Sequence, residues 1–482
     1  MHSTLILLIL VAYFTMLMVV SYVTGRKSTD NESFFTARHS SPWWVVAIGM
    51  IGASISGVSF VSVPGMVGTI SFTYLQTVFG FFFGYLIIAQ VLLPLYYRLQ
   101  LTSIYTYLGQ RFGSRSYTTG ASFFLLSKTL GAAARLYVVA FILQNMVFEA
   151  LGIPFWLTIT GILLMIWLYT FRSGIKSIVW TDTLQTLVML AAMITMLVKL
   201  LDMNELTIGS FVNELYVSSK SRIFVFDDWI SKQHFVKQFF SGIFIALVMT
   251  GLDQDMMQKN LTCRNLKDAQ KNMYWYGIAF IPFNLLFLMI GWLMLTYAQS
   301  TGIILPSAGD ALLPFYAQNY FGTAVMLMFV TGMIAAAFSS ADSALTALTT
   351  SFMVDILKVK NTDNKKRLRI AVHAGISLLF VIIVLIISKV NDRSIIDTIY
   401  VLVSYTYGPL LGMFAFGLFT RRKPNDNWIP YIAVASPVIC FTINELSINY
   451  FGYAFGYELL LMNGLLMFAG IYLSSLYGNK KS

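Results

Sequence analysis

Long apolar segments recur along the 482-residue chain, and they limit its possible folds more than any other feature. About 13 of these segments reach roughly 17 residues, the length that an α-helix needs to cross the hydrocarbon core of a bilayer. Lipid offers no partners for free backbone groups, so each segment is expected to be helical. The sequence therefore predicts an all-α polytopic membrane protein with about 13 transmembrane helices. The predicted spans are residues 4–24, 43–64, 72–97, 118–148, 155–171, 177–201, 236–257, 273–298, 321–356, 368–388, 396–419, 428–449 and 457–477.

The charged residues agree with this class and indicate an orientation. Only 11% of the chain is charged and 57% is hydrophobic, which leaves too little polar surface for a soluble core of this size. The net charge is +11, but 23 of the 32 basic residues, Lys259 and Arg369 among them, fall in loops on one side of the predicted membrane. Cytoplasmic loops carry such an excess. We therefore expect no nucleic-acid partner, a plasma or inner membrane location, an outer N-terminus and a cytoplasmic C-terminus.

The sequence shows no pattern that indicates catalysis. Its two cysteines and four histidines are scattered, and no nucleophile–base pair or metal-binding cluster stands out. We therefore do not expect an enzyme. A transporter-like membrane sensor is the other class to consider, but it would need an output domain, and we see none in the sequence.

Two predicted spans are interrupted by glycine next to polar residues. In the second span, Gly52 and Gly57 bracket Ser54 and Ser56, and in the seventh span Gly251 precedes three polar residues. The two spans open matching groups of five helices, which is typical of an inverted repeat with a binding site at unwound helices near the middle of the membrane. The alternative for the serines is close helix packing through small residues. For Asp255, the alternative is a place near the inner surface.

A third polar group lies in the ninth span. Ala336, Ser339, Ser340 and Ser343 share one helical face, and Asp342 lies beside that face. Hydroxyl oxygens near the carbonyl oxygens of a broken helix suit a small hard cation, because such ions take oxygen ligands. The alternative is serine-mediated helix packing, with Asp342 bonded to a neighbour.

Three further ionisable residues lie within spans, where the default interpretation is functional. Asp182 could pair with a lysine or complete a cation site. Lys128 is expected to extend towards the inner surface. Arg135 lies near mid-helix, and its planar guanidinium suits a carboxylate, which could belong to Asp182, to Asp342 or to an anionic solute.

Three segments resemble the sodium:solute symporter family, which includes sodium-coupled glucose, iodide, multivitamin, proline, pantothenate and sialic acid transporters. Residues 169–185 contain Trp-Thr-Asp and resemble the family's GGI…WTDxxQ segment. Residues 251–259 resemble its GxNQxxxQR segment, with Asp253 for Asn and Lys259 for Arg. Residues 336–343 resemble its AxxSSxxS segment. Helix number and order also agree over most of the chain.

The resemblance implies a LeuT-like fold and sodium-coupled import by alternating access. The chain would form one membrane domain that functions as a monomer. Its parts would be an extra helix and inner loop at 1–42, a first repeat at 43–203, an outer loop at 204–235, a second repeat at 236–420, and two C-terminal helices at 421–482. The solute would be a small polar organic molecule such as a sugar, a sialic acid or another carboxylate. An amino acid or a vitamin is the alternative.

The resemblance also implies the binding residues. One sodium ion would bind the first set of residues, and a second ion is possible at the second set. Asp342 would be an additional carboxylate there. Asp253 adds negative charge to the predicted solute pocket and could suit a sugar or a zwitterion. The first sodium set is Gly52, Ile55, Ala336, Ser339 and Ser340; the second is Asp182, Ser339, Ser343 and Asp342; the solute set is Ser54, Ser56, Ser59, Gln76, Arg135, Asp253, Gln254 and Tyr407.

Overall fold

The structure, a computed structural model, describes residues 2–25, 31–171, 174–359, 365–389 and 395–478. Arg172 and Ser173, which belong to the segment 169–185 discussed above, lie outside the described residues. In the first half of the chain the α-helices are α1 (His2–Gly25), α2 (Asn31–Thr36), α3 (Trp43–Ser54), α4 (Gly57–Ile70), α5 (Tyr74–Ile87), α6 (Leu93–Arg98), α7 (Thr106–Arg111), α8 (Ser114–Leu143), α9 (Phe155–Thr170), α10 (Ile175–Met203) and α11 (Ile208–Val217).

The second half continues the same all-helical pattern. Its helices are α12 (Phe235–Ala246), α13 (Gln254–Asn260), α14 (Leu266–Thr301), α15 (Leu312–Asn319), α16 (Gly322–Ser351), α17 (Lys366–Ile387), α18 (Ile395–Phe419), α19 (Ile429–Phe451) and α20 (Leu459–Gly478). Short π-helical turns extend α5, α8, α12 and α16. In these turns each backbone hydrogen bond joins residues five positions apart, one more than in an α-helix.

The number of spans agrees with the sequence-based prediction. Among the described residues, 10 helices are long and apolar enough to cross a membrane, and two bent pairs pass the same test together. The helix α9 is apolar but shorter, at 16 residues. Together these elements correspond to the predicted spans, which confirms the prediction of about 13 transmembrane helices. The exact boundaries of the two repeats stay a prediction.

Both predicted interruptions are breaks between two helices. The chain bends by 62° between α3 and α4, and by 70° between the extended α12 and α13. At the first break the glycines also permit close packing. A Cβ atom at Gly52 would lie 2.1 Å from Thr186 Oγ1, and one at Gly57 would lie 2.0 Å from a methyl carbon of Val139. The helix break and the tight packing, which the sequence left as alternatives, therefore occur together.

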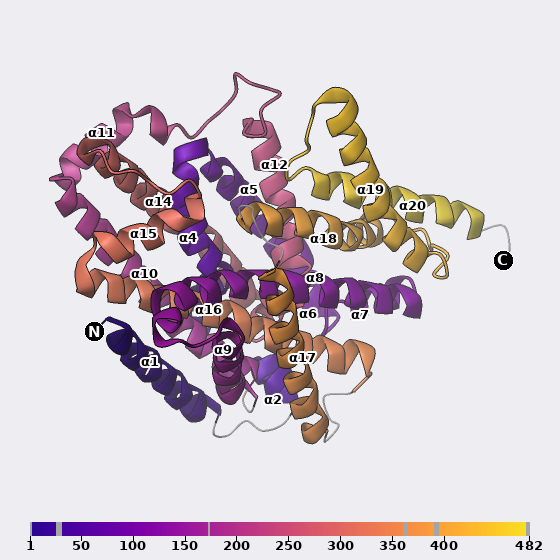
Figure 1. Cartoon of the computed structure of the whole chain (residues 1–482). Coiled ribbons are helices and arrows are strands. Elements are labelled where there is room, and N and C mark those ends of the chain that lie inside the picture. The colour runs from indigo at the N-terminus through magenta and orange to yellow at the C-terminus, as the bar shows by residue number, and fades with distance from the viewer. Residues whose placement is uncertain (1, 26–30, 172–173, 360–364, 390–394, 479–482) are drawn as a thin grey trace.

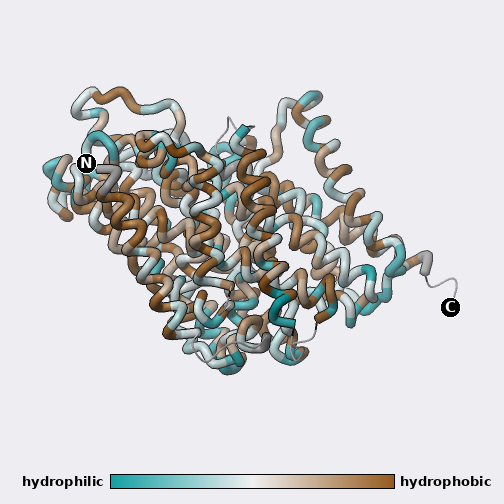
Figure 2. Tube along the Cα trace, turned by 60° about the horizontal axis from the view of Figure 1, so that its bottom comes forward, coloured by the Kyte–Doolittle hydropathy of each residue, from teal (hydrophilic) through white to brown (hydrophobic). Residues whose placement is uncertain are grey.

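The helix α16 forms the centre of the packing. Every residue from Gly332 to Ser351 is buried, and α16 contacts α8, α10 and both halves of the first bent pair. Figure 1 places α1 at one edge of the bundle and α19 with α20 at the opposite edge. Hydrophobic residues follow the helices in Figure 2, and hydrophilic residues gather at their ends and in the loops. The polar residues of α16 thus lie within the bundle, away from lipid.

Two basic residues are not where the sequence placed them. The side chain of Arg369, expected in an inner loop, is fully buried at the start of α17, with its guanidinium carbon 4.2 Å from the centre of the Phe34 ring. Lys259, also expected in a loop, lies in α13 and is 1% exposed. Both positions were wrong because a basic residue at the edge of an apolar run is typical of a loop, and its burial depends on contacts with distant parts of the chain.

Candidate functional site

A cavity of about 80 Å³ lies where the two broken helices meet. It is bounded by α3, α5, α8, α12, α13, α14 and α18, so segments far apart in the sequence share it. Aromatic and small side chains form much of the wall, and a few polar groups converge on it, as expected of a small-molecule site. The polar residues of its wall include Ser54, Lys128, Arg135, Asp253 and Tyr407.

The negative charge of Asp253 is compensated inside the protein. Lys128 Nζ lies 3.2 Å from both carboxylate oxygens of Asp253 and 2.8 Å from Asp255 Oδ2. Tyr407 OH donates a hydrogen bond to Asp253 Oδ2 across 2.6 Å. Asp253 also caps α13, because its Oδ1 accepts from the amide of Asp255 at 2.9 Å. The charge of Asp253 is therefore not free for a cationic solute.

These contacts bear on two expectations about the surroundings of Asp253. Lys128 does not extend towards the inner surface, because its ammonium group turns to the two aspartates and its side chain is 10% exposed. Asp255 is likewise buried, with 4% of its area exposed. The expectation for Lys128 was wrong because its charge has partners on a distant helix, which lowers the cost of burial; the depth of Asp255 in the membrane stays a prediction.

Arg135 is the cavity residue with unused hydrogen-bonding capacity. It comes from the middle of α8, is half-buried and lines the cavity. Among the described residues, none forms a hydrogen bond or an ion pair with its guanidinium group. The two internal carboxylates considered above, Asp182 and Asp342, have other partners. Neither of these two carboxylates is therefore the partner of Arg135 in the structure.

The remaining residues of the predicted solute set have different places. Ser54 lines the cavity and forms a 2.7 Å hydrogen bond with Tyr276 OH. Ser56 and Ser59, at the start of α4, are not part of the wall.

The two glutamines of the predicted solute set hold loops instead. Gln76 accepts from the amide of Val225 at 3.1 Å, so it holds the predicted outer loop. Gln254 accepts from the amide of Ile104 and donates to the carbonyl of Thr102, which ties α13 to the predicted inner loop.

The break between α3 and α4 offers carbonyl oxygens to a cation. The amide of Ser56 donates back to the carbonyl oxygen of Ser54, 3.1 Å away. Among the described residues, no donor from outside α3 reaches the carbonyl oxygen of Gly52, and none reaches that of Ile55. The C-terminal end of a helix also carries partial negative charge, which favours a cation there. The first predicted sodium set therefore has two free backbone ligands.

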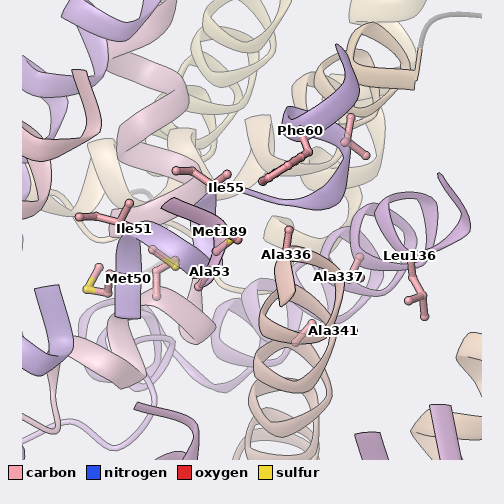
Figure 3. Packing of buried hydrophobic residues seen from close by; sticks show 14 of the residues in the cluster. Met50, Ile51, Ala53, Ile55, Phe60, Leu136, Met189, Ala336, Ala337 and Ala341 are labelled. Carbon is pink, nitrogen blue, oxygen red and sulfur yellow. The ribbon is translucent and has the colours of Figure 1, made fainter. Parts of the chain in front are cut away.

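The neighbouring face of α16 supplies hydroxyl oxygens. Ser340 Oγ donates to the carbonyl oxygen of Ala336 at 3.0 Å, and Ser339 Oγ donates to Asp182 Oδ1 at 2.6 Å. Each hydroxyl proton is thus engaged, while lone pairs remain for an ion. α16 packs against α3 and α4, and Figure 3 shows Ala336 beside the broken segment that carries Ala53 and Ile55. The residues present fit a sodium ion, which prefers oxygen ligands.

The second predicted sodium set is brought together, but a lysine is already bound to it. Lys259 Nζ lies 2.8 Å from Asp182 Oδ2, and both side chains are almost completely buried. Ser343 Oγ approaches Asp182 Oδ2 and Asp342 Oδ1, each at 3.2 Å. Tyr169 OH donates to Asp342 Oδ2 at 2.7 Å. Of the two alternatives for Asp182, the structure shows the pair with a lysine; the sequence did not identify that lysine as Lys259, which was expected in an inner loop.

The second break differs from the first because side chains satisfy its carbonyl groups. Tyr96 OH donates to the carbonyl oxygen of Gly251, and Tyr105 OH donates to that of Leu252, each across 2.9 Å. No local sequence pattern indicates these two tyrosines, because their role depends on a contact between the two halves of the chain. The free carbonyl oxygens therefore lie at the first break, next to the serines of α16.

The geometry agrees with comparisons to known proteins. The model of the sodium:solute symporter family matches residues 34–426. The chain belongs to this family. The resemblance seen in the three sequence segments is thereby confirmed, and so is the prediction of a multi-pass membrane transporter, because the family consists of sodium-coupled transporters.

Individual relatives match most of the chain in sequence, and a solved structure matches nearly all of it in fold. The sodium/sialic acid symporter NanT of Aliivibrio fischeri is 25% identical over 466 residues, which cover 94% of this chain and 90% of NanT. Sodium-coupled monocarboxylate transporter 2 of Homo sapiens is 24% identical and covers 84% of this chain, which spans 66% of its length. The structure of a Na+-coupled sialic acid symporter in a substrate-bound outward-open state superposes with a TM-score of 0.83, at 17% identity and 98% coverage of both chains. This similarity confirms the predicted fold.

Proposed function

We propose that this symporter imports a small organic anion, most simply a carboxylate, together with Na+. Arg135 carries the proposal, because its guanidinium group faces the cavity without a partner among the described residues. An arginine in this position can form two parallel hydrogen bonds to a carboxylate. Asp253 opposes an anion less than a free carboxylate would, since Lys128 pairs with it and Tyr407 OH donates a hydrogen bond to it.

The chemistry of the relatives supports an acid rather than a neutral sugar. Sialic acid and monocarboxylates, named for two of the relatives, share a carboxylate group. The cavity volume of about 80 Å³ is small compared with the roughly 300–1,000 Å³ of pockets for drug-sized ligands. This volume favours a short carboxylic acid over a large sugar acid. Amino acids and vitamins, the alternative solutes, are outcomes of the test below.

In the proposed cycle, Na+ binds the carbonyl oxygens at the end of α3 together with Ser339 and Ser340. The ion fixes the broken segment, so the cavity next to it is ordered before the solute arrives. The carboxylate then binds Arg135, and the two helix groups rock to open the opposite side. We propose that the N-terminus is outside, the C-terminus is cytoplasmic and the transporter acts as a monomer.

A thermal-shift screen of the purified protein tests the choice of solute. Short monocarboxylates, a sialic acid, amino acids, neutral sugars and vitamins are compared in saturating Na+. We expect carboxylates to raise the melting temperature of the wild type, and the Arg135→Gln variant to lose this response. Arg222→Gln serves as the control, because Arg222 lies in an exposed outer loop and pairs with exposed Asp227. A response of Arg135→Gln to acids equal to that of the wild type would exclude the anion proposal.

A further inference from the structure

The oxygen cluster around Asp182 contains a positive charge that belongs to the protein. Lys259 Nζ lies 2.8 Å from Asp182 Oδ2 and 3.8 Å from Asp255 Oδ1. Asp182 also accepts hydrogen bonds from Ser339 and Ser343. These are the oxygens expected to surround a second sodium ion. The ammonium group of Lys259 already lies against the Asp182 carboxylate on which such an ion would depend, so the residues present do not fit the second ion.

Lys259 is held firmly in this position by its helix. The carbonyl oxygen of Lys259 accepts from the amide of Thr262 at 3.0 Å and from its hydroxyl at 2.7 Å. Next to it, Gln258 donates to the carbonyl oxygen of Phe35 at 2.7 Å, and Asn260 accepts from Asn272 at 2.6 Å. The ammonium group therefore sits on a short helix that is fixed on both sides, and its side chain is 1% exposed.

Electrostatics explain why a lysine and a sodium ion exclude each other here. Both would use the carboxylate of Asp182, so the two positive charges would lie close together within the protein. Like charges repel more strongly there than in water, because the local dielectric constant is lower. The lysine is covalently attached and its charge needs no dehydration at each cycle. The tethered charge is therefore favoured over a free ion.

We propose that Lys259 is a resident cation that replaces the second sodium ion, so that this transporter couples one Na+ to each solute molecule. The proposal rests on the sodium-coupled function described above and specifies its stoichiometry. It has an electrical consequence. One Na+ moving with one monocarboxylate carries no net charge across the membrane, whereas two sodium ions with the same solute would carry one positive charge.

The number of bound ions tests the proposal without any solute. Purified full-length protein is dialysed to equilibrium against radiolabelled Na+, with choline to balance the ionic strength. We expect one bound Na+ per wild-type chain at saturation. In Lys259→Met, which keeps the length of the side chain and removes its charge, Asp182 loses its cation and the number should rise to two. In Lys259→Arg, which keeps the charge, it should stay at one.

A double variant serves as the control for the unpaired buried charge that Lys259→Met creates. Lys259→Met with Asp182→Asn removes both charges of the pair and should again bind one ion. Two ions in the wild type would overturn the proposal and leave the sodium-coupled function intact. One ion in a folded Lys259→Met variant would also overturn it. No bound Na+ in the wild type would reject the sodium-coupled function itself. If Lys259→Met does not fold, the wild-type number decides.

Discussion

Tyr407 OH donates a hydrogen bond to Asp253 Oδ2 across 2.6 Å, and this contact joins two residues that are 154 positions apart. Tyr407 belongs to α18, and Asp253 caps α13 just after the second break. Both line the cavity. The bond therefore connects the cap of a broken helix with a separate helix across the proposed solute site, and movement of one should affect the other.

Removal of this hydroxyl group should weaken solute binding. In Tyr407→Phe, Asp253 loses one donor, and a hydrogen bond to a charged group contributes about 1.5–3 kcal/mol. We expect the solute concentration for half-maximal thermal stabilisation to rise about tenfold. The matched control is Tyr405→Phe, since Tyr405 belongs to the same helix, does not line the cavity and packs on Phe441. Equal affinities in both variants would contradict this role.

The serines of α16 should determine sodium affinity. Ser340→Ala removes one proposed oxygen ligand, and we expect about a tenfold rise in the Na+ concentration needed for half-maximal stabilisation. Ser62→Ala is a matched control, because the Ser62 side chain is also buried, lies outside the site and has no hydrogen-bond partner among the described residues. The sodium set is wrong if Ser340→Ala binds Na+ as tightly as Ser62→Ala.

Lys128 should matter for stability as well as for transport. Lys128→Met leaves the buried carboxylates of Asp253 and Asp255 without their shared cation, which should cost about 3–5 kcal/mol of folding free energy. We expect a clear fall in melting temperature, and partial recovery when Asp255→Asn is added. Lys199→Met is the control, because the pair of Lys199 with Asp202 is partly exposed and such pairs contribute about 1 kcal/mol or less. Similar melting temperatures for the two single variants would refute the internal pairing.

Cys263 offers a probe for the opening of the predicted inner side. Burial raises the pKa of the Cys263 thiol to about 12, so its reactive thiolate is scarce at neutral pH. Tyr97 OH donates to the carbonyl oxygen of Cys263 at 3.2 Å, and Ser41 pairs with the same loop. In a Cys440→Ser background, we expect slow alkylation of Cys263 in saturating Na+, and several-fold faster alkylation when Tyr97→Phe removes this hydrogen bond. An unchanged rate would show that this contact does not close the inner side.

Features that are determined by residues close together in the sequence could be predicted. The spans and both breaks follow from local features, because a run of apolar residues needs a helix in lipid and glycine beside Asp253 or Ser54 interrupts it. The face of α16 with Ser339, Ser340 and Ser343 follows from helical periodicity alone. These features could be read from short windows of sequence.

The pairing of charges could not be predicted in the same way. Lys128 meets Asp253 only because α8 passes the cap of α13, and Lys259 meets Asp182 only because α13 turns by 70° into the bundle. Gln76 looks like a pocket residue in the sequence, yet its amide holds the predicted outer loop at Val225. Each of these contacts joins residues far apart in the chain, so the partner is invisible until the helices are placed.

Uptake into proteoliposomes tests the central claim most directly. The full chain is reconstituted, and entry of a radiolabelled carboxylate identified in the thermal-shift screen is measured with an inward Na+ gradient and with choline in its place. We predict transient accumulation above the equilibrium level with the Na+ gradient, none with choline, and none for Arg135→Gln under either condition. Equal uptake in Na+ and in choline by the wild-type protein would contradict the account.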